Sequence, residues 1–276
     1  MNSEHIPATP ALQQPLSEIV ESVRKRYADR KRPDTPNLPP WNIGTFPSGG
    51  PNVPPNATNL RWRNRKLDIG LHIAEYTWSE PPVCESPEAL RAGCLDRGGD
   101  QYHITITGID ENVGELYIDE YNIRDLGISY DFCKIEVTQN AFSHATHLRT
   151  AVFDLYILNV QKHAFSQADN LHAVYFKHLG NIAEEAFSHC KALQMVELRA
   201  IWNVGERCFF GCPQLRSVTL TGCSDMKIGN DCFSECPALQ KLTIPKGVRY
   251  KKPKINHLIH NIYNKHSILN IKIDKN

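Results

Sequence analysis

The sequence predicts a repeat solenoid of short parallel strands, β-rich with some helix, with an α+β unit at its N-terminal end and a disordered N-terminal arm. A phenylalanine recurs at intervals of 22 to 24 residues, a leucine follows it six residues later, and apolar residues stand nine and eleven positions after it. Units of this length cannot bury their apolar faces alone, so neighbouring units have to stack into one continuous core. The five phenylalanines are Phe142, Phe165, Phe187, Phe209 and Phe233.

Each repeat unit predicts a bend followed by a short strand. In the third unit, Leu193 precedes the strand, and Val196 and Leu198 share one of its faces. Strands of successive units should pair in parallel about 4.8 Å apart, so that equivalent residues form columns. The five units cover 132–245, with the phenylalanine column on the convex side of the core.

The first 59 residues read as a mobile arm. Apolar residues at helical spacing predict a short amphipathic helix over 16–28. Eleven of the 18 prolines fall within the first 60 residues, so 29–59 is expected to be a linker. Such a helix could pack on its own domain, or it could dock on a partner or an export chaperone. The linker isolates the helix, which favours the partner.

Residues 60–131 are expected to form an N-terminal capping domain. Leu67, Ile69, Leu71 and Ile73 alternate as in a half-buried strand, and Ile104 and Ile106 mark a second strand. Between these two strands, Ser86 and Pro87 predict the start of a helix.

Degenerate units are expected at both ends of the solenoid. The strand spacing recurs upstream at Val113, Leu116 and Ile118, and downstream at Ile268, Ile271 and Ile273. Residues 246–276, the C-terminal cap, hold eight Lys or Arg residues against one acidic residue. A basic segment on an acidic body can bind an anionic partner, although it is more often a solvated cap.

The repeat resembles the BspA-type leucine-rich repeat. The resemblance rests on Ala186-Phe187-Ser188-His189-Cys190-Lys191-Ala192-Leu193 and on the run from Cys232 to Pro245, which follow that family's "AF-x-x-C-x-x-L-x-x-V-x-I-P" unit. The family is known for bacterial surface and secreted proteins, and some protozoan ones, that bind host or matrix proteins. The resemblance therefore implies a non-enzymatic protein-binding module, such as a secreted bacterial effector that acts in host interaction and virulence.

The expected partner site is the concave sheet face, where residues between the buried positions point outward. Its mixture of charges and polar groups suits a protein ligand better than a phosphate backbone. The candidate binding residues are Thr150, Val152, Asp154, Tyr175, Lys177, Met195, Glu197, Arg199 and Thr219.

Two other functions stay open. Arg61-Trp62-Arg63-Asn64-Arg65-Lys66 together with the basic tail fits a nucleic-acid interface, although the net charge of +1 argues neither way. An enzyme would need an unrecognised site in 60–131, since the chain carries no familiar catalytic, phosphate-binding or dinucleotide-binding motif. We expect no cofactor and no resident metal, and the oligomeric state is left open.

The chain also holds nine cysteines, an odd number. Five occupy repeat slots that hold alanine in other copies, so they should be small buried residues rather than zinc ligands. Any functional thiol is expected among the remaining four, which are Cys84, Cys94, Cys133 and Cys223.

No apolar run is long enough to span a membrane, and the first residues lack the pattern of a cleavable export signal. The chain is therefore expected to be cytoplasmic at synthesis, and any export into a host cell to proceed without such a signal.

Overall fold

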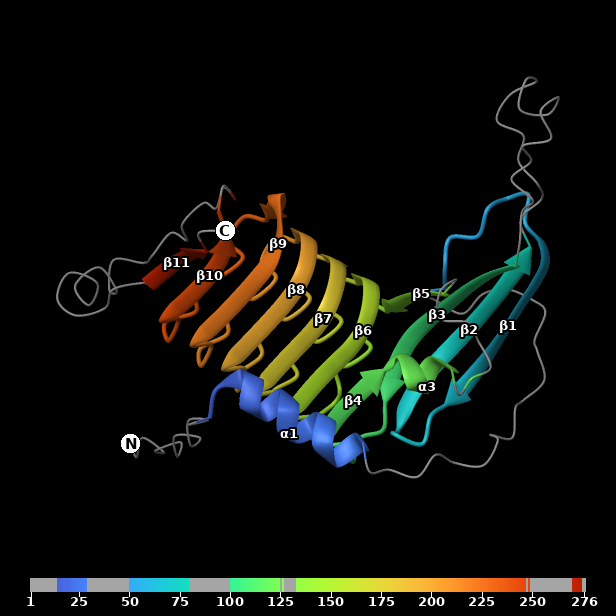
Figure 1. Ribbon diagram of the computed structural model, residues 1–276, viewed down its shortest axis with the longest axis horizontal. Helices are drawn as coiled ribbons and strands as arrows, with labels where there is room; N and C mark the ends of the chain where they lie inside the picture. The colour runs from blue at the N-terminus through green and yellow to red at the C-terminus, as the bar shows by residue number, and fades with distance from the viewer. Residues whose placement is uncertain are drawn as a thin grey trace, which may run out of the picture.

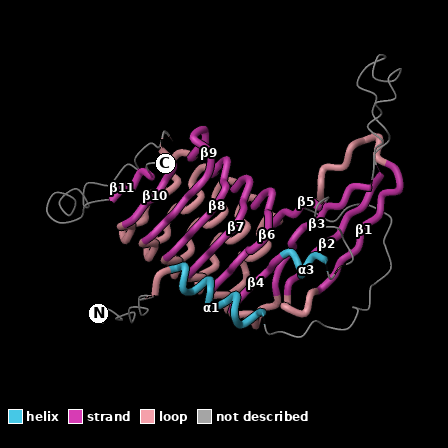
Figure 2. Tube along the Cα trace, viewed as in Figure 1, coloured by secondary structure: helices cyan, strands magenta, loops and turns pink. Residues whose placement is uncertain are grey.

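The computed structural model describes residues 14–28, 50–79, 100–124, 126, 133–246, 248 and 270–274. These residues form an eleven-stranded sheet with α1 laid across the repeat strands (Figures 1 and 2). Most of the strands run parallel, and the strand order follows the sequence apart from β4, which pairs with β6. The elements are α1 (Leu16–Ala28), β1 (Thr58–Lys66), β2 (Leu71–Ser79), β3 (Asp100–Ile109), β4 (Glu115–Asp119), α3 (Glu120–Arg124), β5 (Cys133–Val137), β6 (Thr150–Val160), β7 (Ala173–Ile182), β8 (Met195–Val204), β9 (Ser217–Ile228), β10 (Lys241–Pro245) and β11 (Asn270–Asp274).

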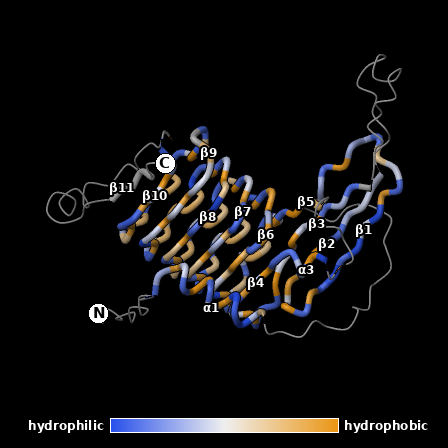
Figure 3. The backbone as a smooth tube through the Cα atoms, in the orientation of Figure 1, coloured by the Kyte–Doolittle hydropathy of each residue, from blue (hydrophilic) through white to orange (hydrophobic). Residues whose placement is uncertain are grey.

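The repeat phenylalanines form the predicted column in the core. Phe142, Phe165 and Phe187 stack with ring centroids 4.5 Å apart at each step, and the stack continues through Phe209 and Phe233 at 5.3 and 5.5 Å. The strand phenylalanines Phe153 and Phe176 stack in parallel at 4.2 Å and meet the column edge-on. The apolar residues of successive strands lie in register within the same core (Figure 3). The predicted solenoid is confirmed.

The unit upstream of the first full repeat is split in two. Glu115 of β4 pairs with Thr150, 35 positions later, whereas Glu136 of β5 pairs with Asn159, 23 positions later. β4 and β5 together therefore match the single strand β6, with 12 additional residues between them. These residues include α3, so the irregular spacing upstream comes from an insertion within a repeat unit.

The downstream end unit also has the predicted register. β11 pairs in parallel with β10, and Ile271 and Ile273 lie opposite Leu242 and Ile244. Ile268 and most of the basic segment 246–276 lie outside the described residues.

The strand predicted across Leu67 to Ile73 is wrong. The chain reverses there, because β1 and β2 form an antiparallel hairpin whose turn holds Leu67 and Ile69. Gly70 adopts φ +75° in this turn, and an added Cβ would lie 2.6 Å from the Val113 side chain. Both turn residues pack against the main core, so the alternating apolar pattern continues through the reversal. The strand predicted around Ile104 is β3, and the helix predicted at Ser86 lies outside the described residues.

The prediction of a mobile arm is corrected over the helix. α1 spans the amphipathic segment and is docked on this chain's own sheet, where Val20 and Val23 are buried. The first of the two alternatives, packing on its own domain, therefore applies. The rest of the predicted linker up to residue 49 lies outside the described residues.

Candidate functional site: the outer sheet face

The predicted partner site lies on the face of the repeat strands opposite the phenylalanine column, here called the outer sheet face. Alternation along each strand places these side chains there, since Val196 and Leu198 point into the core from either side of Glu197. Val152 and Tyr175 are buried on this face, whereas Arg199 is exposed. The other predicted residues, Thr150, Asp154, Lys177, Met195, Glu197 and Thr219, are half-buried.

The burial of Val152 and Tyr175 has one cause, which is α1. The helix crosses the strands from β8 to β4 (Figures 1 and 2). Val20 and Val23 form a small apolar cluster with Val152 and Tyr175, separate from the main core. The two apolar clusters therefore lie on opposite faces of one sheet.

An ion pair fixes the middle of α1. The Arg24 guanidinium donates two hydrogen bonds to the Asp154 carboxylate, at 2.8 and 2.9 Å. These hydrogen bonds raise the pKa of Arg24 above its ordinary value. The Asp154 side chain is only 12% exposed, so water screens this pair less than it would an open surface pair.

Two guanidinium groups lie close to the Tyr175 ring. Arg24 of α1 lies over the ring at 5.5 Å from the centroid, and Arg199 of β8 lies over it at 5.4 Å. Arg199 is also held by Glu197, which accepts its hydrogen bond at 2.6 Å. The Tyr175 ring on β7 therefore contacts both Arg24 of the helix and Arg199 of β8.

The C-terminal end of α1 is fixed on β4. The rings of Tyr27 and Tyr117 lie 5.1 Å apart, and the Tyr27 hydroxyl donates a 2.8 Å hydrogen bond to the Glu115 carbonyl. Arg26 pairs with the Glu115 carboxylate. Burial, with the nearby charges of Asp119 and Asp154, raises the pKa of Tyr117, so it stays a neutral hydrogen-bond donor to Asp154.

Sequence reasoning missed Glu115 and Tyr117 as part of this surface. They alternate with Leu116 and Ile118, which the repeat spacing assigns to a degenerate end unit. The available signal was their alternation with those buried residues, which places them on the same face as Thr150 and Val152.

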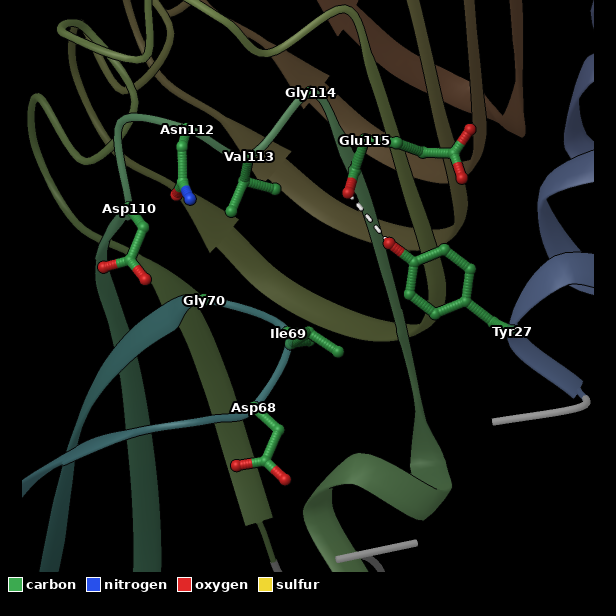
Figure 4. Close-up of a pocket in the computed structure, with 9 residues that line it drawn as sticks. All are labelled: Tyr27, Asp68, Ile69, Gly70, Asp110, Asn112, Val113, Gly114 and Glu115. Atoms are coloured by element: carbon green, nitrogen blue, oxygen red, sulfur yellow. Dashed lines mark hydrogen bonds between the residues drawn. The ribbon is translucent and has the colours of Figure 1, made fainter. Parts of the chain in front are cut away.

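A shallow hollow lies beside the end of α1, where Tyr27 meets the β1–β2 turn and the β3–β4 turn (Figure 4). Its volume is about 340 Å³, and its lining residues are Tyr27, Asp68, Ile69, Gly70, Asp110, Asn112, Val113, Gly114 and Glu115. Asp110 is paired with Lys66 and His72, and Glu115 with Arg26. The charges of two of its three carboxylates are therefore already balanced within the chain.

Several side chains of the basic stretch proposed for nucleic acid form ion pairs or packing contacts within the fold. Arg63 and Arg65 are buried and both pair with Glu75, which is 1% exposed. Lys66 pairs with Asp110 at 2.6 Å. Trp62 packs with the apolar cluster of Ala74, Tyr76 and Trp78. Arg63, Arg65 and Trp62 thus stabilise the β1–β2 hairpin, whereas Arg61 and Lys66 stay exposed.

The repeat cysteines are structural. The thiols of Cys190, Cys212 and Cys236 donate hydrogen bonds of 3.0 to 3.1 Å to the Phe165, Phe187 and Phe209 carbonyls, each in the preceding unit. Over the described part of the chain, no three His, Cys, Asp or Glu side chains are arranged to hold a metal ion. Outside it lie Cys84, Cys94, His257, His260 and His266.

Thiol reactivity should follow this burial. We expect iodoacetamide to modify exposed Cys223 in the native chain and to leave the five buried repeat cysteines unmodified. Burial raises the pKa of Cys208, a hydrogen bond with Cys190 raises that of Cys212, and one with Cys212 raises that of Cys236, so little reactive thiolate forms. Burial also raises the pKa of Cys133, to about 12.

The measurement is mass spectrometry of the alkylated peptides, with the protein unfolded in guanidinium as the control. Equal modification of Cys212 and Cys223 in the native protein would contradict the assignment.

No helix among the described residues is long and apolar enough to cross a membrane. No curated protein gives a significant match to the chain. Among solved structures, the chain is similar to the T. pallidum Leucine Rich Repeat protein (TpLRR), with 22% sequence identity and a TM-score of 0.41. That alignment covers 52% of this chain and 63% of TpLRR, so this chain spans less than two thirds of the length of TpLRR.

The family comparison agrees with the geometry of the repeat. Residues 134–261 match the BspA type leucine rich repeat region in six copies, one more than the five predicted from the spacing. This family suggests a protein-interaction module, and its members are typically non-enzymatic scaffolds. The stacked units and the phenylalanine column lie within residues 134–261, the part of the chain that matches the BspA type leucine rich repeat region.

Proposed function

We propose that this chain is a non-enzymatic protein-interaction module and that its partner protein binds the outer sheet face. The observation that carries this proposal is the docked helix, because α1 is a polypeptide segment held on this face by side-chain contacts. A surface that accommodates one amphipathic helix has the shape and chemistry to accommodate another polypeptide.

Part of the outer sheet face lies beside α1 and stays accessible. Arg199 exposes 52% of its side chain there, with Glu197 next to it and Thr219 opposite Glu197 on the neighbouring strand. One cation, one carboxylate and one hydroxyl offer mixed contacts to a protein surface. A nucleic-acid backbone would instead require clustered positive charge.

We expect a photo-cross-linking residue at position 219 of the full chain to capture the partner from a host-cell lysate. The same residue at position 191 should not capture it, because exposed Lys191 lies in the turn that precedes the β8 strand. Arg199→Glu should weaken capture about tenfold or more, which corresponds to about 1.4 kcal/mol of binding free energy. The measurement is the yield of the cross-linked band across a dilution series.

Lys191→Glu is the matched control, since it makes the same charge change away from the strands and should leave capture intact. Equal cross-linking from positions 191 and 219, or unchanged capture by the Arg199 variant, would place the partner elsewhere.

A further inference from the structure

We propose that α1 is a built-in, displaceable ligand of the outer sheet face, and that the surface beneath it is the docking site for a basic amphipathic helix of a partner protein. This proposal rests on the proposed function and specifies the partner's chemistry. It also assigns α1 a regulatory role, because the partner helix has to replace it.

The dimensions of helix and sheet match. A helix advances about 5.4 Å per turn, and neighbouring strands lie about 4.8 Å apart. A helix that crosses the strands therefore places about one turn over each strand. Tyr27 accordingly meets Tyr117 on β4, while Arg24, one turn earlier, meets Asp154 on β6 and Tyr175 on β7. The repeat spacing makes this face a template for helices.

The charges of the surface select a basic helix. Several carboxylates lie along the outer sheet face, and three of them, one each on β4, β6 and β8, expose no more than 28% of their side chains; the one on β8 is already paired with Arg199. These three are Glu115, Asp154 and Glu197. In α1, Arg26 pairs with Glu115 and Arg24 pairs with Asp154. An incoming helix with an aliphatic stripe and one or two arginines beside it would satisfy the same groups, whereas an acidic helix would leave Asp154 facing like charge.

The helix can leave without opening the main core. Its apolar cluster is separate from the phenylalanine core, and the strands pair with one another, whereas the hydrogen bonds from α1 to the strands come from its side chains. Val20 and Val23 are its only buried side chains. A helix of 13 residues is marginal by itself in water, so docking is what holds it. Departure would uncover Val152, Tyr175 and Tyr117, a patch rich in tyrosine, which interfaces favour.

The test uses the full chain and a fluorescein-labelled synthetic peptide of residues 14–28 as the probe. Val20→Asp with Val23→Asp in the protein should release α1 and open the site. We expect the peptide to bind this opened variant at least about tenfold more tightly than the wild type, because a tethered helix competes at a high effective concentration. Fluorescence anisotropy measures the affinity, and circular dichroism verifies that the opened variant keeps its sheet.

A charge exchange tests the orientation of the helix. Asp154→Arg in the opened variant should weaken the peptide about tenfold or more, and Arg24→Glu in the peptide should restore binding. A peptide that itself carries Val20→Asp and Val23→Asp should fail to bind, which controls for attraction by charge alone.

Three results would overturn the proposal. Equal affinity of the peptide for wild type and opened variant would mean that α1 does not close the site. No binding to a folded opened variant would mean that the surface does not take helices. A wild-type dimer that the opened variant loses in analytical ultracentrifugation would make α1 of a second copy the occupant. If the peptide results fail while position 219 still cross-links a partner, the proposed function stands and this inference falls.

Discussion

Phe187→Ala is expected to lower the free energy of unfolding by about 3 to 5 kcal/mol, the range for deleting a buried phenylalanine from a packed core. Phe187 is completely buried and stacks on Phe165 and Phe209 at 4.5 and 5.3 Å. The substitution removes the middle of the column, so both neighbouring units lose a contact. In a solenoid the stability of each unit depends on the interfaces with its neighbours, and a central break weakens both sides.

Phe210→Ala is the matched control. Phe210 follows a column member in the sequence but is only partly buried, with Arg207 over its ring at 4.2 Å. Its loss should cost about 1 kcal/mol, mainly the cation–π contact. Guanidinium denaturation followed by circular dichroism gives both values. A loss at Phe187 no larger than that at Phe210 would show that the column does not carry the core.

Glu75→Gln is expected to cost about 3 to 5 kcal/mol of unfolding free energy, because it leaves two buried guanidinium groups without their carboxylate. Glu75 accepts hydrogen bonds from Arg63 and Arg65, the latter at 2.6 Å. The side chains of both arginines are less than 10% exposed, so water cannot take the place of the lost charge. Thermal and chemical denaturation measure the loss.

Two further variants give this prediction its controls. Glu184→Gln removes an exposed ion pair with Lys162 at 3.1 Å and should cost at most about 1 kcal/mol. Replacement of all three buried charges, by Arg63→Met, Arg65→Met and Glu75→Leu together, should recover much of the stability lost in Glu75→Gln, since no uncompensated charge remains. A triple variant less stable than Glu75→Gln would assign the cost to packing rather than to charge.

The repeat core could be predicted from the sequence because its information is local and repeated. Phe187, Leu193, Val196 and Leu198 recur at fixed offsets in five copies, and parallel stacking turns equal offsets into columns. The same reasoning placed Leu116 and Ile271 in end units, and the register of β4 and β11 agrees. His144 and His189 share the slot two positions after the phenylalanine, which accepts different residue types, and both are exposed.

Irregular parts of the chain were harder to predict. The apolar alternation does not indicate the β1–β2 reversal, because Leu67 and Ile69 pack on the core from within the turn and the pattern continues through it. The pairing of Arg63 and Arg65 with Glu75 was likewise invisible, since it joins residues on two strands whose register the sequence does not show.

The sequence by itself determined the solenoid, the two faces of its strands and the amphipathic character of residues 16–28, because these follow from spacing alone. Only the tertiary structure decided where that helix lies. Its apolar stripe would fit many surfaces, and the choice is made by Asp154, Tyr175 and Tyr117, which β4, β6 and β7 bring together from distant positions. The partner site predicted from the sequence is therefore partly covered, because α1 of the same chain lies over Val152 and Tyr175.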